Sequence, residues 1–150
     1  MDPIARRLAD KSWPYASQDP EALGAIERRI ANVGRRGGLL TYSELVSGIS
    51  FHLPSVEQGR PLQLGIPEWS DLHRAIVGDF LGRMCLDTYA RGRFMGSALV
   101  VSGIDHTPSE GFRALMRDIG LLHGRGQPEF LKFWTQEVSK VHAWYAANDW

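Results

Sequence analysis

The sequence contains one cysteine, Cys85, among its 150 residues. A single thiol excludes an internal disulfide and a zinc site built from several cysteines, and it is compatible with a cytoplasmic protein. Net charge is missing too, because 17 basic side chains are balanced by 17 acidic ones. No overall field therefore draws the chain to nucleic acid or to an anionic membrane, and any binding to a charged partner must use a local patch.

Long apolar runs are also absent from the sequence. No segment approaches about 18 uninterrupted apolar residues, so we expect no transmembrane helix and no membrane partner. The first 15 residues lack the apolar centre of a signal peptide, which favours the cytoplasm. The histidines are dispersed without a metal-binding spacing, and the glycines form no phosphate or dinucleotide motif, so the sequence predicts neither a metal nor a cofactor.

Capping residues and apolar periodicity predict two helices in the first third of the chain. Asp19, Pro20 and Glu21 are typical of a helix start, and the helix should end at Gly37 and Gly38. Thr41 and Glu44 have the spacing of a capping box, in which each side chain bonds the backbone of the other residue. We expect a helix of about two turns after Thr41, ending near Gly48.

The remainder of the chain predicts one strand between helices. A wide apolar stripe predicts a central helix from Pro67 to about Ala90. The continuous apolar run 94–102 predicts a strand buried on both faces. A second capping box, from Thr107 to Glu110, should begin the next helix, and a last helix should begin at Pro128.

This order of elements predicts an α+β domain that is predominantly α. We expect residues 19–150 to form a single domain and residues 1–18 to lie on it as an N-terminal arm. The early order of helix, short extended segment, short helix and longer helix is that of a winged helix. The fold expected is therefore a winged-helix-like helical core with a small, short-stranded sheet and an added C-terminal helix.

Two local resemblances accompany this order. The segment GLLTYSEL, residues 38–45, resembles the TYGELA entry in the DNA-binding half of the alkylguanine-DNA alkyltransferases. Their reactive cysteine lies in a Pro-Cys-His-Arg motif, whereas Cys85 lies in RMCL, so the resemblance does not extend to alkyl transfer. The run SALVV, residues 97–101, with the later Gly111 and Phe112, is similar to a group of small bacterial proteins without an assigned activity.

The first functional hypothesis is a non-catalytic bacterial module that binds DNA or RNA, or that belongs to a nucleic-acid-associated assembly. Phosphate contacts provide most non-specific affinity, and arginine pairs flank the expected winged-helix elements. The predicted nucleic-acid-binding residues are Arg28, Arg29, Arg35, Arg36, Arg74, Arg91 and Arg93.

The second hypothesis is a protein-binding module, such as an immunity or inhibitor protein, a complex subunit or a homodimer. The last 21 residues contain more large rings than one face of one helix can bury, which favours a partner surface. The predicted partner-binding residues are Phe133, Trp134, Trp144, Tyr145 and Trp150.

The third hypothesis is an enzyme that uses the loop after the predicted strand. Asp105, His106, Thr107, Ser109 and Glu110 include the residue types of a catalytic site. Helix capping explains Thr107 and Glu110 equally well, and Cys85 lies in an apolar stripe where a thiol is buried and inert. The sequence therefore contains no recognisable catalytic constellation, and no catalytic residue is predicted.

Overall fold

A computed structural model describes residues 2–148 of the chain. Most of these residues are helical and one pair of short strands forms a sheet, which confirms an α+β fold that is predominantly α. The elements in chain order are α1 (Pro3–Ala9), the 3₁₀ turn η1 (Ala16–Gln18), α2 (Pro20–Arg35), β1 (Leu40–Thr41), α3 (Tyr42–Val46), α4 (Asp71–Gly92), the 3₁₀ turn η2 (Gly96–Leu99), β2 (Val100–Val101), α5 (Glu110–Asp118) and α6 (Gln127–Ala147).

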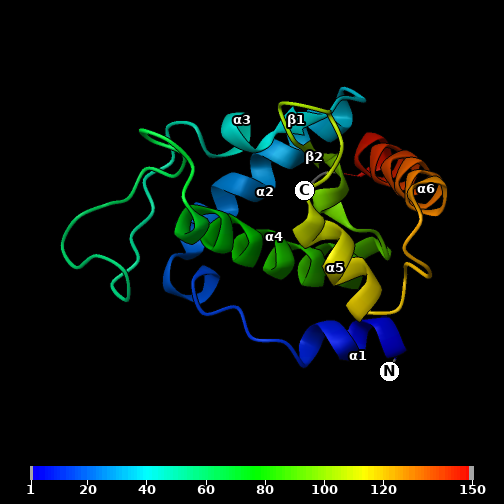
Figure 1. Cartoon of the computed structure of the whole chain (residues 1–150), viewed down its shortest axis with the longest axis horizontal. Helices are drawn as coiled ribbons and strands as arrows, with labels where there is room; N and C mark the ends of the chain where they lie inside the picture. Colours follow the sequence, from blue (N-terminus) through cyan, green and yellow to red (C-terminus); the bar gives the residue numbers. More distant parts are fainter. Residues whose placement is uncertain (1, 149–150) are drawn as a thin grey trace.

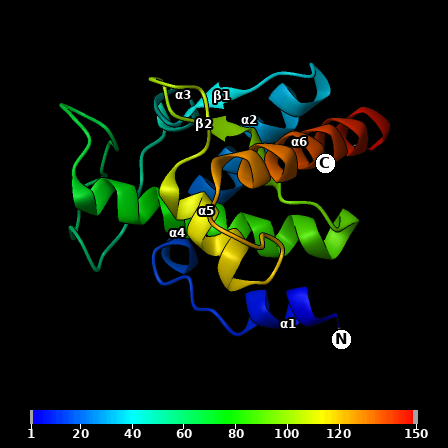
Figure 2. The same ribbon diagram turned by 45° about the vertical axis from the view of Figure 1, so that its right-hand side comes forward.

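Helix α4 crosses the middle of the molecule. In Figure 1, α1 lies below it, α5 in front of it and the strand pair above it, while the long connection between α3 and α4 projects at the left. Figure 2 shows α6 passing over α2 on the side of the sheet. Because α4 has neighbours on several sides, it buries more than one face, with Ile76 and Phe80 on one and Leu81 and Cys85 on another. Within residues 2–148, no helix has the length and apolar character needed to cross a membrane.

The predicted starts of α2 and α3 are confirmed. The Asp19 carboxylate accepts a hydrogen bond from the Ala22 backbone N–H at 3.0 Å. The capping box is complete, because Glu44 N–H donates to Thr41 Oγ1 at 3.1 Å and Thr41 N–H donates to Glu44 Oε1 at 2.8 Å. These bonds hold the carboxylate as the charged form and lower the pKa of Glu44.

The strand prediction for residues 94–102 is correct in burial and wrong in most of its conformation. All of residues 94–101 are buried, but residues 96–99 form η2, and only Val100 and Val101 are a strand. That strand pairs in parallel with β1, with Leu40 opposite Val100 and Thr41 opposite Val101. The described residues that follow β2 lead into α5, whereas the wing of a winged helix is a β-hairpin. The winged-helix comparison therefore stays a prediction.

The second predicted capping box does not form. Ser102 N–H donates to the Thr107 carbonyl at 2.9 Å and His106 N–H donates to the Ser102 carbonyl at 3.0 Å. These bonds close a turn that includes Thr107, so the helix begins later, with Ser109 as its N-cap. Glu110 instead forms an ion pair with Arg117.

The N-terminal arm is more regular than its sequence indicates. It contains α1, whose residue Leu8 is fully buried, and the turn η1. The Asp79 carboxylate of α4 accepts backbone N–H bonds from Tyr15 at 2.9 Å and Ala16 at 2.7 Å. The segment 13–16 is therefore fixed against α4 and forms part of the wall described below.

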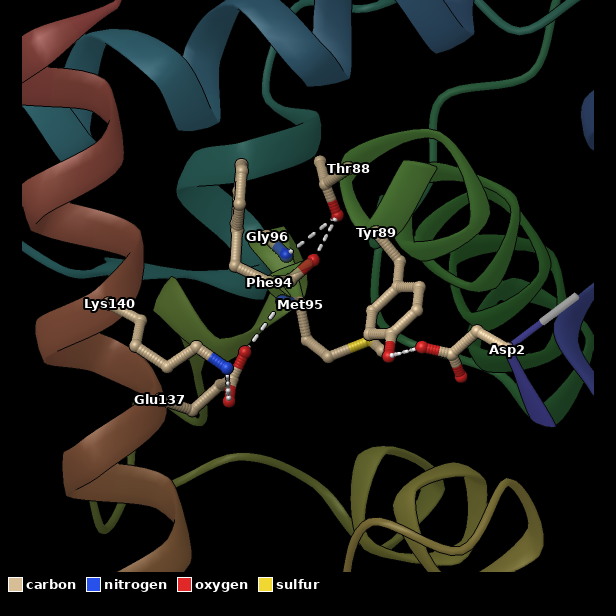
Figure 3. Close-up of polar contacts among 8 residues, drawn as sticks. All are labelled: Asp2, Thr88, Tyr89, Phe94, Met95, Gly96, Glu137 and Lys140. Atoms are coloured by element: carbon tan, nitrogen blue, oxygen red, sulfur yellow. Dashed lines mark hydrogen bonds and ion pairs between the residues drawn. The ribbon is translucent and has the colours of Figure 1, made fainter. Parts of the chain in front are cut away.

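Buried polar groups fix the turn between α4 and β2 (Figure 3). Thr88 Oγ1 donates to the Phe94 carbonyl at 2.8 Å and accepts from Gly96 N–H at 3.1 Å. From the other side, the buried Glu137 carboxylate accepts from Met95 N–H at 2.7 Å. Each of these backbone groups lies out of reach of water, where a missing partner costs free energy. Thr88 and Glu137 thereby determine the path of the chain into β2.

The Thr88→Val substitution keeps the shape of this side chain and removes both hydrogen bonds. We expect the free energy of unfolding to fall by about 2–4 kcal/mol, because two buried backbone groups lose their partner. Thr88→Ser, which keeps the hydroxyl, should cost about 1 kcal/mol for the lost methyl group. Urea unfolding of the two variants measures this difference, and equal losses would contradict the role given to the hydroxyl.

Candidate functional site

The carboxyl ends of the two parallel strands place four hydroxyl-bearing residues together. Because Thr41 lies opposite Val101, the next residues on the two chains, Tyr42 and Ser102, leave the sheet side by side. The Tyr42 hydroxyl donates to Ser109 Oγ at 2.9 Å and accepts from Ser109 N–H at 3.1 Å. Tyr42, Ser43, Ser102 and Ser109 form what we call the hydroxyl cluster.

The other two members of the hydroxyl cluster also accept hydrogen bonds. Ser43 Oγ accepts from the Trp69 indole N–H at 3.1 Å, and Ser102 Oγ accepts from Ile104 N–H at 3.1 Å. Burial raises the pKa of Tyr42, and the bonds with Ser109 oppose that change only in part. Tyr42 therefore stays a neutral hydroxyl and does not act as a base near neutral pH.

The hydroxyl cluster opens on a groove of about 880 Å³ between α4 and α5. This volume lies within the range of about 300–1,000 Å³ typical of pockets for small molecules. The apolar side chains that line the groove are Trp13, Trp69, Val77, Leu81, Ile104, Phe112, Ala114 and Leu115. We call this feature the α4–α5 groove.

Two glycines of α4 shape the α4–α5 groove in different ways. A Cβ atom on Gly82 would overlap the six-membered ring of Trp13, so the absence of a side chain there lets the indole lie against the helix. A Cβ atom on Gly78 would meet nothing within 4 Å. Gly78 is therefore not required by packing, and its missing side chain leaves space in the groove.

The charged side chains at the groove are all paired within the chain. Arg74 lies 3.2 Å from the Asp71 carboxylate, and Lys11 lies 3.6 Å from Asp118. Glu110 is paired with Arg117. Among the described residues that line the α4–α5 groove, no charged side chain is left without an opposite charge from this protein.

A second cavity, of about 480 Å³, lies between the N-terminal segment, α2 and α4. Trp13 and Lys11 line both this cavity and the α4–α5 groove. The smaller cavity also has polar side chains in its wall, Lys11, Ser12, Ser17 and Arg83. The α4–α5 groove has nearly twice its volume and contains the hydroxyl cluster, and we take it as the candidate binding site.

The predicted nucleic-acid-binding arginines do not converge on one surface. Arg74 and Arg93 are separated by nearly the whole of α4, about 28 Å at 1.5 Å per residue. Arg29 donates to the carbonyls of Glu44, Leu45 and Ser47 at 3.2, 2.9 and 2.6 Å, so it caps the end of α3. Arg93 forms an ion pair with Asp2. These two arginines have structural roles.

Most of the remaining arginines lie near acidic residues or have a local partner. Burial raises the pKa of Glu27, with a further rise from nearby Asp87 and a lowering from Arg91, Arg83 and Arg28. The region around Arg28 and Arg91 is therefore of mixed charge. Arg35 and Arg36 are exposed at the end of α2, where Arg35 donates to Asn32 Oδ1 at 3.1 Å.

The predicted partner-binding rings are largely covered. Tyr145 is 1% exposed and Trp134 9% exposed, and the Trp134 indole donates to the Ala98 carbonyl at 2.8 Å. The structure therefore assigns these two residues to the core, because α6 packs them against η2 and α2. Phe133 and Trp144 are half-buried, and the Trp144 ring lies tilted against Phe94, with 5.0 Å between ring centres. Trp150 lies outside the described residues.

The loop predicted as a possible catalytic site does not bring its acid and imidazole together in a cavity. Asp105 is exposed, and its Oδ1 accepts from Thr107 N–H at 3.1 Å and Thr107 Oγ1 at 3.0 Å. These bonds lower the pKa of Asp105 and leave it a weak base. His106 is exposed too. The loop contributes Ile104, Ser109 and Glu110 to the α4–α5 groove instead.

Nucleophilic and metal chemistry find little support in the described residues. Burial raises the pKa of Cys85 to about 11, although the contact of its thiol with Ser97 Oγ at 3.0 Å opposes the rise. The thiol is therefore protonated at neutral pH and a poor nucleophile. Within residues 2–148, no three histidine, cysteine or acidic side chains are grouped where they could hold a metal ion.

No family model, curated protein or solved structure matches this chain. The two local resemblances noted from the sequence therefore stay predictions, and the function must be argued from the groove itself.

The sequence did not identify the hydroxyl cluster. Tyr42 follows the predicted short extended segment and Ser102 ends the predicted strand. The position of each residue at the end of a strand could therefore be predicted. What was missing was the parallel pairing of the two strands, which joins residues about 60 positions apart. The sequence did not predict a role for Trp13 either, because its ring packs against Gly82 of α4, a residue far from it in the chain.

Two glycine substitutions on α4 test this description of the groove. Gly78→Ala should raise the free energy of unfolding by about 0.5–1 kcal/mol, because alanine favours the helix and its methyl group enters open space. Gly82→Ala should lower it, since the new methyl group must displace the Trp13 ring. Thermal or urea unfolding measures both, and a loss of stability in Gly78→Ala would show that the space beside Gly78 is filled.

Proposed function

We propose that the protein is a non-catalytic binding module whose ligand is a predominantly apolar small molecule held in the α4–α5 groove. The observation that carries the proposal is a groove of about 880 Å³ with largely apolar walls, the hydroxyl cluster, and charged side chains that are all paired within the chain. Pockets for small molecules have this composition, with apolar walls for affinity and a few polar groups for orientation. The cytoplasm, where a lone thiol stays reduced, is the proposed location.

Gly78 supports a functional origin of the groove. A glycine in the interior of a helix costs about 0.5–1 kcal/mol relative to alanine, and packing does not require one at position 78. A binding role is consistent with this cost, since a bulky side chain there would occupy the space of the ligand. Loss of stability in exchange for a site is a common compromise in proteins.

Catalysis has less support at this site than binding does. The hydroxyl cluster lacks an acid or base with a pKa shifted toward neutrality, and the raised pKa of Tyr42 keeps that group neutral. General acid–base catalysis requires such a group within hydrogen-bond reach of the reacting atoms. We therefore propose binding, and not catalysis, as the function of this site.

Direct dye binding tests the proposal. N-phenyl-1-naphthylamine is a neutral apolar dye that fluoresces in apolar pockets, and we expect it to bind the protein with one site. Gly78→Trp should weaken dye binding at least tenfold, because the indole fills the groove from a solvent-facing position of α4. Gly78→Ala is the matched control and should bind the dye within about threefold of the unmodified protein.

The test compares the dye affinities of Gly78→Trp and Gly78→Ala. Circular dichroism of Gly78→Trp establishes that the helices are retained, so that weaker binding reflects the filled groove. Absence of dye binding to the unmodified protein, or equal binding by a folded Gly78→Trp, would exclude the α4–α5 groove as the site.

Nucleic-acid binding is the second candidate function, and exposed Arg35 and Arg36 at the end of α2 are the observation that favours it. If these arginines contact phosphates, a gel-shift series should show retardation of duplex DNA or RNA that weakens as salt increases. Replacing both arginines by glutamine should reduce the salt dependence. Retardation that is absent at low salt would end this candidate without affecting the groove.

A further inference from the structure

The serine residues of the hydroxyl cluster use their oxygens as acceptors. Ser43 Oγ accepts from Trp69, Ser102 Oγ accepts from the backbone of Ile104, and Ser109 Oγ accepts from Tyr42. A serine hydroxyl also carries one hydrogen that it can donate. No acceptor for any of these hydrogens is found among the described residues, so the cluster offers three unused O–H donors.

These donors lie at one end of the α4–α5 groove. Ser43, Ser102 and Ser109 all line it, and they are held together by the β1–β2 register and by the Tyr42 hydroxyl, which bonds Ser109 through both its backbone and its side chain. The groove continues from Ser109 along α5 toward Asp118, about 13 Å at 1.5 Å per residue. A ligand that lies along α5 would therefore place one end on the donors and its body on apolar walls.

Charge restricts the ligand further. Lys11 and Arg74 are already paired with Asp118 and Asp71, so the groove offers no unpaired cation to neutralise a carboxylate. Glu110, which follows Ser109 directly, is itself paired with Arg117. A ligand cation would likewise find no unpaired carboxylate, because Glu110 and Asp118 are already paired with Arg117 and Lys11. Neutral acceptors suit this end of the groove best.

We propose that the ligand is a neutral molecule with an apolar chain and a hydrogen-bond acceptor, such as the carbonyl of an ester or amide, bound by Ser43, Ser102 and Ser109. This assignment of the ligand's chemical class rests on the proposed function of the groove. It adds the identity of the polar end and its charge, neither of which apolar walls determine.

Competition against N-phenyl-1-naphthylamine tests the class of ligand. The competitors are methyl octanoate, octanoate and octylamine at pH 7.5, which share a chain length and differ in the charge and hydrogen bonding of the polar end. Methyl octanoate should displace the dye at a concentration at least tenfold lower than either ion. Displacement by octanoate at an equal or lower concentration would overturn the proposal of a neutral ligand.

Serine variants test the donors themselves. Ser43→Ala and Ser102→Ala should each weaken methyl octanoate about three- to tenfold, the usual effect of one lost hydrogen bond. Ser102→Thr, which keeps a hydroxyl, should retain the affinity. Ser139→Ala, at an exposed position of α6, is the matched control and should not change the affinity for methyl octanoate. Dye affinity in the same variants reports any displacement of Trp69 or Ile104, which lose a hydrogen-bond acceptor. The expected result is a larger loss of affinity for methyl octanoate than for the dye, which lacks a carbonyl acceptor.

The two proposals fail in different ways. If the dye does not bind the unmodified protein, the groove is not a small-molecule site and both proposals are wrong. If the dye binds and Gly78→Trp blocks it, but the serine variants leave methyl octanoate unaffected, the groove is a site and the assigned donors are wrong.

Discussion

The fold depends on a small set of buried hydrogen bonds to the turn between α4 and β2. Thr88 satisfies Phe94 and Gly96 from one side, and Glu137 satisfies Met95 from the other. The backbone polar groups of a turn inside the core cannot bond water, so side chains must supply their hydrogen bonds. These bonds bring α4, the turn and α6 to one point, and they fix the direction in which the chain enters β2.

That direction determines the candidate site. β2 runs parallel to β1 and ends beside it, which brings Ser102 next to Tyr42 and allows Tyr42 to hold Ser109 at the start of α5. The position of α5 in turn sets the width of the groove above α4. In α4, Gly78 leaves open space and Gly82 leaves room for the Trp13 ring. The buried hydrogen bonds at the turn thus determine the geometry of the surface groove through the pairing of the two short strands, β1 and β2.

The distribution of charge follows the same pattern of internal satisfaction. Arg29 caps α3, Arg93 pairs with Asp2, and the charged residues at the groove pair with one another. With a net charge of zero, the protein also has no overall field that attracts a polyanion. Recognition by apolar contact and neutral hydrogen bonds is consistent with this arrangement.

The sequence by itself determined the helical class, the starts of α2 and α3, and the burial of residues 94–101, because caps and apolar spacing act over a few residues. It misplaced the start of α5, because a turn from Ser102 to Thr107 uses the residue expected to cap the helix. Only the tertiary structure decided the parallel pairing of β1 with β2, the covering of Trp134 and Tyr145, and the hydroxyl cluster. Each joins residues far apart in the chain, and which of them meet depends on how α4 and α6 pack around the same turn.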